Sequence, residues 1–331
     1  MKKILTVLFA LISLTAIQTK TEAAAIDRTI SSSGINKSAV SVSVKDVKTG
    51  KTVYKLNEKQ PNMPASTLKI ITLSASLDTL GEDYEFKTQL YKNTNNELIL
   101  KLGADPFLRS SEIKELIASA TEKKILSPKA IYIDDYVLDS TEWGEGWQWD
   151  DDLNPLMPKF SSYNLDGNLL KIIIAPTSQG SPANIYTAKF YPTTFMNLVT
   201  TGDKSDITIS RNNSISPDLL TVEGTVKGQI SKQIPINHPK RYFILRLEDA
   251  IRSEKMDYYG KFSQKKTPDT NIYLVSEISH PVEPAIEQLL KNSNNFVAET
   301  VFKIAGGQFV KNTGSLENSL KMLNAYFEKI G

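Results

Sequence analysis

The sequence predicts an α/β (α+β) protein in which helical segments at the two ends flank a long β-rich middle. An apolar run over residues 68–80, ended by Gly81, has the pattern of a buried helix. Short alternating segments with turn residues between them fill most of residues 86–225, as strands do. Helical periodicity returns from Glu283 onward. One domain interrupted by an inserted β-rich region explains this order more simply than three domains in tandem.

The first 25 residues have the three-part pattern of a secretory signal peptide. Lys2 and Lys3 precede an apolar core over residues 4–17, and Ala23 and Ala25 are placed for cleavage after Ala25. The core is too short for a comfortable transmembrane span, and an uncleaved N-terminal anchor is the alternative. We therefore expect an exported protein, in the periplasm or extracytoplasmic cell-wall space, with at most peripheral membrane association.

Composition excludes several classes of protein. The chain has no cysteine, so it contains neither a disulfide framework nor a lipid-anchor cysteine. A net charge of +2 without long like-charge runs is not the pattern of a nucleic-acid-binding protein. We expect no metal or other cofactor. The only histidines, His238 and His280, each precede a proline, as in loops, and the run Asp150–Asp152 lacks the alternation of a calcium loop.

The elements follow from the local patterns. Residues 40–54 predict a β-hairpin that leads into the helix at 68–80, because valines alternate with serines before a turn at Asp46–Gly50. Beyond Gly81 we expect, in order, strands at 86–91 and 97–102, a helix at 111–124, a strand at 130–133, further strands over 169–225, a strand at 241–247 and a helix at 248–256. Helices are predicted at 285–290, 296–304 and 315–330, the second ending at Gly306-Gly307.

The start of the helix at 68–80 carries a serine and a lysine three residues apart, Ser66 and Lys69. On a helix this spacing places both side chains on one face, about 5–6 Å apart at Cβ. A lysine in an apolar environment loses affinity for its proton, so Lys69 is predicted to activate Ser66 as a nucleophile. The pairs Ser111/Lys114 and Ser263/Lys266 share the spacing but lie in polar sequence. The alternative for Ser66 is a capping serine followed by an ordinary lysine.

A second candidate element is Ser293-Asn294-Asn295, which interrupts two predicted helices. A tight break of this kind can direct a hydroxyl and an amide into a cleft beside Ser66. Ser293 would then relay a proton, and Asn295 would bind a substrate amide. The same Ser-x-Asn pattern occurs at Ser162/Asn164 and Ser210/Asn212, so a polar helix–helix turn is the alternative.

These motifs, taken in order, resemble the D-alanyl-D-alanine carboxypeptidase/endopeptidase family, the class C low-molecular-mass penicillin-binding proteins. The resemblance covers the chain from about Ile26. The matching segments are 64–69 with 77–81, 103–106, Asp134-Asp135 with 143–151, and 293–299, where Asn294 replaces the usual aspartate. The resemblance implies a serine β-lactamase/transpeptidase-like domain formed by residues 26–89 and 266–331. The inserted β-rich domain or domains would occupy residues 90–265.

The resemblance also implies an activity. Ser66 would attack the bond between two D-alanines of a peptidoglycan stem peptide, with Lys69 as general base, Ser293 as proton relay and Asn295 holding the acyl side. β-Lactams would trap the same serine. By the same resemblance, Asp134 would meet a substrate ammonium group, with a structural loop acid as the alternative. Carboxypeptidase and endopeptidase action both stay open.

One departure from the family pattern concerns a third motif, Lys-Thr-Gly on a strand after the Ser-x-Asn segment. Lys311–Gly314 matches the family's loop before its last helix instead, and the sequence ends at Gly331. We therefore expect a chain truncated before this motif. A catalytically impaired protein that binds cell-wall peptides is the alternative function. A hydrolase of the Ser-His-Asp type ranks below both, because no Gly-x-Ser-x-Gly motif is present.

Overall fold

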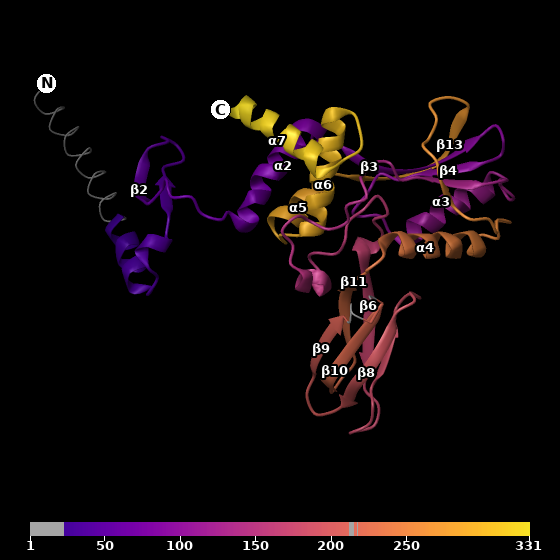
Figure 1. Ribbon diagram of the computed structural model, residues 1–331, viewed down its shortest axis with the longest axis horizontal. Helices are drawn as coiled ribbons and strands as arrows, with labels where there is room; N and C mark the ends of the chain where they lie inside the picture. The colour runs from indigo at the N-terminus through magenta and orange to yellow at the C-terminus, as the bar shows by residue number, and fades with distance from the viewer. Residues whose placement is uncertain (1–22, 212–214, 217) are drawn as a thin grey trace, which may run out of the picture. The chain divides into compact units, whose positions relative to one another are not determined.

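The computed structural model describes residues 23–211, 215–216 and 218–331 (Figure 1). Most of the predicted signal peptide, residues 1–25, lies outside this range. The chain divides into two compact units, residues 1–65 and 66–331, which we describe separately. No helix of the described residues combines the length and apolar composition needed to cross a bilayer.

The first unit contains the predicted hairpin. Strand β1 (Val42–Lys45) pairs antiparallel with β2 (Thr52–Leu56), after a short 3-10 helix, η1 (Lys37–Ala39). Asp46 forms the turn because its Oδ1 accepts a hydrogen bond of 2.7 Å from the backbone N–H of Thr49. The hairpin prediction is confirmed.

Four helices of the second unit form one group in Figure 1: α2 (Leu68–Leu80), α5 (Glu283–Leu290), α6 (Asn295–Val310) and α7 (Leu316–Ile330). Helix α6 is central and contacts the other three. Its apolar residues pack with those of its neighbours, including Leu73, Val301, Phe302 and Met322. The predicted end of α6 at Gly306-Gly307 is wrong. Both glycines lie inside α6, where they allow α7 to approach closely. A Cβ at Gly306 would stand 2.4 Å from the backbone nitrogen of Ser319 in α7.

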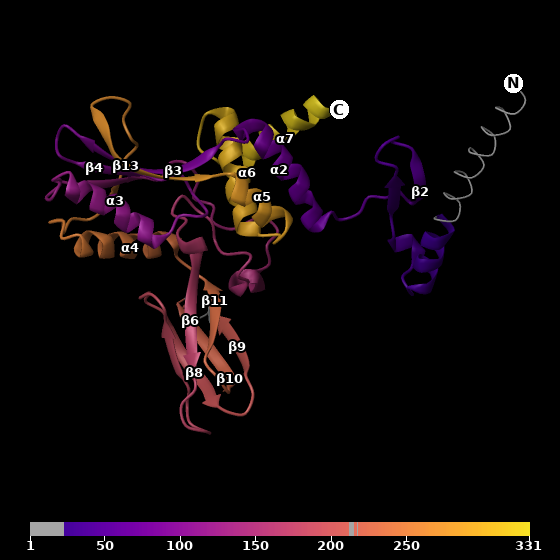
Figure 2. The same ribbon diagram turned by 180° about the vertical axis from the view of Figure 1, so that it is seen from behind.

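A five-stranded sheet lies beside these helices, in the order β12-β5-β4-β3-β13. Its strands are β3 (Glu85–Asn93), β4 (Leu98–Lys101), β5 (Ile131–Asp134), β12 (Ser263–Gln264) and β13 (Ile272–Pro281). Strand β3 pairs antiparallel with both β4 and β13, whereas β5 is parallel to β4 and β12. Helices α3 (Ser110–Glu122) and α4 (Pro239–Ser253) lie side by side in Figures 1 and 2 and bury apolar residues in the same core as the sheet.

The predicted strand at 241–247 is wrong, because these residues belong to α4. Pro239 occupies the first position of this helix, where its missing N–H costs nothing. Tyr242, Phe243, Leu247 and Ala250 are buried at spacings of one, three and four residues, which place them on one helical face. The short continuous apolar run Tyr242–Leu245 suits a strand as well as a helix, and only the longer window shows the helical period.

The β-rich middle forms two three-stranded sheets, β11-β6-β7 and β8-β10-β9. Figures 1 and 2 show their strands gathered into one block. The strands are β6 (Leu169–Ala175), β7 (Asn184–Thr187), β8 (Thr194–Thr201), β9 (Asp206–Arg211), β10 (Leu219–Val226) and β11 (Ile230–Pro235). Two short 3-10 helices, η3 (Trp149–Leu153) and η4 (Asp166–Asn168), precede them. The predicted α/β class with an inserted β-rich region is confirmed.

The predicted boundaries of the insertion, 90–265, fall at the five-stranded sheet. The boundary at 89/90 lies inside β3, and the boundary at 265/266 lies between β12 and β13. The sheet therefore takes strands from the chain both before and after the β6–β11 block. The division into 26–89 with 266–331, and 90–265, stays a prediction.

Candidate active site

Ser66 and Lys69 come together at the start of α2. Ser66 lies in the 3-10 helix η2 (Ala65–Thr67), and Lys69 lies in the first turn of α2. The Lys69 Nζ atom donates a hydrogen bond of 3.3 Å to Ser66 Oγ. The lysine is only 9% exposed, whereas Ser66 is exposed. The site thus offers an accessible hydroxyl next to a largely buried amine.

Ser293 and Asn295 reach the same place from the break between α5 and α6. The chain turns sharply there because Ser293 adopts a left-handed conformation, with φ of 54°, and Asn294 caps α6 through a hydrogen bond from the N–H of Val297. The turn directs Ser293 Oγ to donate to Ser66 Oγ over 2.7 Å. The structure therefore brings together residues more than 200 positions apart in the sequence.

Lys69 is the centre of this cluster. Its ammonium donates to Ser66 Oγ and Ser293 Oγ, each at 3.3 Å, and to Asn295 Oδ1 at 2.5 Å. Burial lowers the pKa of Lys69, while the charge of Glu299 acts in the opposite direction. A lysine of lowered pKa beside a serine hydroxyl can accept its proton, and Ser293 links the two groups by a second route. The arrangement can generate a serine nucleophile without histidine.

A cavity of about 700 Å³ opens at Ser66 and Ser293 between α2 and α5. Its remaining lining is mostly apolar: Ile70, Leu73, Leu77, Ile286, Leu289 and Leu290. The prediction that α2 is buried on most sides is wrong for its first turn. Within the second unit Leu68 is 44% exposed and Ile70 58%, whereas Leu73 is 4% exposed, because the other helices cover only one side of α2.

Asp134, the predicted partner of a substrate ammonium group, is buried at the end of β5. Its Oδ2 accepts a hydrogen bond of 2.7 Å from the N–H of Thr267, and its Oδ1 accepts a longer one from Tyr136. None of its described hydrogen bonds reaches the Ser66 cluster. Its neighbour Asp135 lines a separate cavity of about 360 Å³ and accepts a hydrogen bond from Tyr163. The binding role of Asp134 stays a prediction.

The two histidines lie elsewhere. His280 belongs to strand β13, so the prediction of a loop histidine is wrong for this residue. Its Nδ1 lies 2.6 Å from Asp105 Oδ2 and its Nε2 lies 3.1 Å from Glu112 Oε1. A Ser-His-Asp triad would require a serine where Glu112 stands. Of the residues that the structure describes, none forms a group of His, Asp and Glu suited to a metal ion.

The sequence analysis assigned no role to Glu299 and Lys303. They follow Asn295 at intervals of four along α6, a helical spacing visible in the sequence. A Lys-Thr-Gly tripeptide also occurs at Lys48–Gly50, but it lies in the turn of the β1–β2 hairpin, where Thr49 bonds to Asp46. Lys311–Gly314 lies, as predicted, in the turn between α6 and α7.

Comparison with known proteins gives consistent matches. The chain is 20% identical over 285 residues to D-alanyl-D-alanine carboxypeptidase DacB of Haemophilus influenzae, covering 81% of this chain and 59% of that protein. It is 21% identical over 304 residues to the D-alanyl-D-alanine carboxypeptidase of Actinomadura sp. strain R39, covering 85% of this chain and 56% of that protein. The chain thus spans less than two thirds of the length of these relatives.

Solved structures show the same fold. The crystal structure of penicillin binding protein 4 from Haemophilus influenzae superposes with a TM-score of 0.74 at 19% identity, covering 88% of this chain and 67% of that one. A structure of that protein in complex with a novel β-lactam gives a TM-score of 0.67 at 17% identity, with 90% and 70% covered. The predicted resemblance is confirmed. The model of the D-Ala-D-Ala carboxypeptidase 3 (S13) family matches residues 22–331, and the chain belongs to this family.

Proposed function

We propose that this protein is a serine-type D-Ala-D-Ala carboxypeptidase/endopeptidase that acts on peptidoglycan stem peptides and is acylated by β-lactams at Ser66. The observation that carries the proposal is the contact of Lys69 with Ser66, Ser293 and Asn295. Ser66 and Ser293 also line the cavity of about 700 Å³. The names of the two relatives, both D-alanyl-D-alanine carboxypeptidases, support the substrate class.

The geometry supports a two-step reaction. Ser66 Oγ attacks the carbonyl carbon between the two D-alanines while its proton passes to Lys69 Nζ, 3.3 Å away. As the C–N bond breaks, a proton returns through Ser293, which contacts both residues, to the leaving amine. An ester on Ser66 remains, and water hydrolyses it to regenerate the hydroxyl. Asn295 orients the acyl side and fixes the lysine through its 2.5 Å hydrogen bond.

The backbone N–H of Ser66 is one candidate donor for the oxyanion that forms in this reaction. In the family, by resemblance, the second donor and a cation for the substrate carboxylate come from a strand with Lys-Thr-Gly after the Ser-x-Asn segment, and residues 296–331 contain no such tripeptide. Export completes the proposal: the pattern of residues 1–25 supports action in the periplasm or cell-wall space.

A fluorescent penicillin tests the nucleophile. We expect covalent labelling of the mature protein, with loss of the label in Ser66→Ala. Ser111→Ala and Ser263→Ala are matched controls, because each removes a serine three residues before a lysine and leaves Ser66 intact. Label that survives Ser66→Ala contradicts the assignment. A second assay, the release of D-alanine from a D-alanyl-D-alanine peptide, separates the enzyme from a protein that only binds cell-wall peptides.

A further inference from the structure

Helix α6 carries a row of polar side chains that leads away from the Ser66 cluster. Asn295, Glu299 and Lys303 are spaced four residues apart, so each stands about one turn beyond the last on the same face. The rest of the helix is mainly apolar and buried, and Lys303 itself is only 2% exposed. Two charged side chains in so apolar a helix are costly unless they compensate each other or nearby charges.

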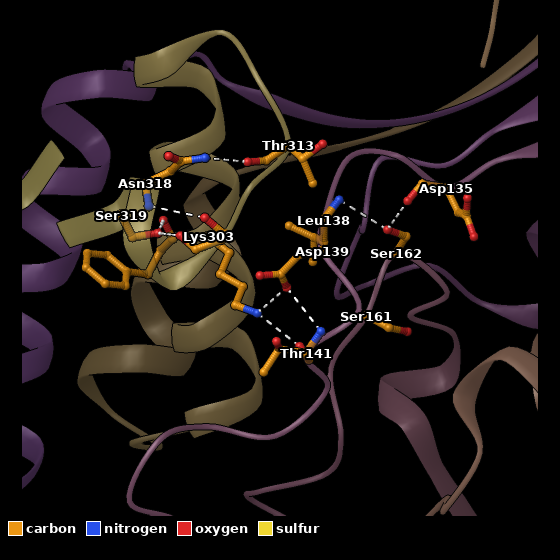
Figure 3. A network of polar contacts seen from close by, with 12 residues as sticks. Asp135, Leu138, Asp139, Thr141, Ser161, Ser162, Lys303, Thr313, Asn318 and Ser319 are labelled. Carbon is orange, nitrogen blue, oxygen red and sulfur yellow. Dashed lines mark hydrogen bonds and ion pairs between the residues drawn. The ribbon is translucent and has the colours of Figure 1, made fainter. Parts of the chain in front are cut away.

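The far end of this row is fixed by an ion pair (Figure 3). Lys303 Nζ donates to Asp139 Oδ1 over 2.7 Å and to the carbonyl oxygen of Thr141 over 2.9 Å. The same ammonium lies 4.9 Å from the centre of the Phe160 ring. Asp139 is oriented in turn by a hydrogen bond of 3.2 Å from the N–H of Thr141. The positive charge of Lys303 is therefore held in place behind Glu299.

The near end of the row is the catalytic lysine, since Asn295 accepts the short hydrogen bond from Lys69. Glu299 stands between the two lysines. In the part of the chain that the structure describes, its carboxylate accepts no hydrogen bond, so it acts on both lysines through space. Burial raises the pKa of Glu299, and the charges of Lys303 and Lys69 oppose this rise.

We propose that Glu299 is a positioning residue that sets what fraction of Lys69 is neutral, and that Lys303, held by Asp139, limits its effect. The inference rests on the proposed role of Lys69 as general base. Other charged groups on the neighbouring helices face outward: Glu287 pairs with Lys291 on α5, Glu317 with Lys321 on α7, and Lys329 of α7 with Asp78 of α2.

The sign of each effect follows from Coulomb's law. An ionised Glu299 favours the charged form of Lys69 and so opposes the lowering of its pKa by burial. Removing this charge lets the pKa of Lys69 fall further. Removing the charge of Lys303 leaves Glu299 uncompensated and takes away a positive neighbour, and both changes raise the pKa of Lys69.

The direct test is an NMR titration of the Lys69 ε-carbon, assigned by the loss of its signal in Lys69→Arg. In Glu299→Gln we expect the titration midpoint to move to lower pH, whereas Glu299→Asp, which keeps the charge, should stay close to wild type. Glu287→Gln is the matched control, because it removes an exposed carboxylate from the adjacent helix α5. A midpoint in Glu299→Gln that is unchanged or higher overturns the proposal.

In a second variant, Lys303→Met, we expect the Lys69 titration midpoint to move in the opposite direction, to higher pH. A lower or unchanged midpoint in this variant also overturns the proposal. The pH profile of labelling by fluorescent penicillin then separates the two proposals. Labelling that shifts with the NMR midpoint supports both. A midpoint that moves while labelling keeps its profile supports the effect of Glu299 on Lys69 and contradicts the role of Lys69 as the base.

Discussion

At the scale of single residues, the site depends on the hydrogen bonds that the Lys69 side chain makes in its charged and neutral forms. A charged ammonium has three N–H donors, and the structure gives it three acceptors: Ser66 Oγ, Ser293 Oγ and Asn295 Oδ1. A neutral amine has two donors and one lone pair. The neutral form can therefore keep Ser293 and Asn295 as acceptors and turn its lone pair to Ser66. In the proposed mechanism, Asn295 and Ser293 thereby orient Lys69 toward Ser66.

Replacing Lys69 should be equally damaging whether or not the charge is kept. We expect Lys69→Arg and Lys69→Ala each to slow labelling of Ser66 by roughly 10²–10⁴-fold, the usual contribution of a general base, because a guanidinium does not deprotonate near neutral pH. Stopped-flow or gel-based labelling rates measure this. Lys114→Arg, in the other helical Ser-x-x-Lys pair, is the control. A rate in Lys69→Arg close to wild type would show that the lysine only supplies charge.

The labelling rate should rise with pH through the pKa of Lys69, which burial lowers from its ordinary value of 10.5. Asn295→Asp places a carboxylate at the 2.5 Å contact with the ammonium and favours its charged form. We therefore expect the rising limb to move to higher pH in this variant. Asn292→Asp, in an exposed position just before the turn, is the control. An unchanged limb in Asn295→Asp would mean that another group titrates.

At the scale of elements, the close approach of α6 and α7 depends on glycines. A Cβ at Gly306 would lie 2.4 Å from Ser319 N and 2.5 Å from Ser319 Cα, and both are backbone atoms that cannot rotate away. Ser319 Oγ in turn donates a hydrogen bond of 2.9 Å to the carbonyl oxygen of Phe302 on α6. The two helices are thus joined where their backbones touch.

Gly306→Ala should destabilise the protein even though alanine favours helix more than glycine does. Forcing extra volume into a packed contact typically costs about 1–3 kcal/mol, and here the helices must separate. Denaturant unfolding gives the change in the free energy of unfolding. Gly228→Ala serves as the control, because a Cβ there meets no atom within 4 Å. Equal stability of the two variants would argue against the tight contact.

The contacts of His280 with Asp105 and Glu112 join β13 to the start of α3. Burial by itself lowers the pKa of His280, but the hydrogen bonds and charges of Asp105 and Glu112 outweigh it, so this pKa is raised above 6.5. The pKa of Asp105 is also raised, because its own burial outweighs the attraction of the histidine. Of these groups, histidine has the ordinary pKa closest to neutral.

The raised pKa makes stability depend on pH. The contribution of His280 is complete below the unfolded value, about 6.5, and is lost as pH rises through the higher folded value. Compared with His280→Gln, the wild type should lose free energy of unfolding across this range. His238→Gln is the control: burial lowers the pKa of His238, so its linkage lies below pH 6.5 and has the opposite sign. Identical slopes in wild type and His280→Gln would contradict the pairing.

At the scale of the whole molecule, the sequence predicted local features best. The hairpin, α2 and the meeting of Ser66, Lys69, Ser293 and Asn295 follow from short patterns and a family resemblance. The continuation of α6 through Gly306-Gly307 was not predicted, because it depends on the contact with α7. The pairing of Lys303 with Asp139 joins distant segments, and nothing local to either residue indicates it.

The division into two units also makes a prediction. Residues 57–64, just before Ser66, have no regular secondary structure and are exposed. Brief digestion with trypsin should therefore cut first after Lys59, and a further cut is expected after the exposed Lys266, between β12 and β13. Mass spectrometry identifies the fragments. Cleavage inside β3 near Leu90, which is fully buried, at the same rate would show that the five-stranded sheet is not formed.

The pairing of β3 with β13 affects the order in which the parts of the protein fold. Leu90 pairs with Ser276, so this ladder closes only after the intervening chain, with the whole β6–β11 block, exists. Pairings between residues so distant in sequence form slowly, because a long loop must lose its freedom first. The sheets of the β6–β11 block span much shorter separations. We expect a refolding chain to build this block early and to assemble the Ser66 site last, since Ser293 reaches it only through the segment that follows β13.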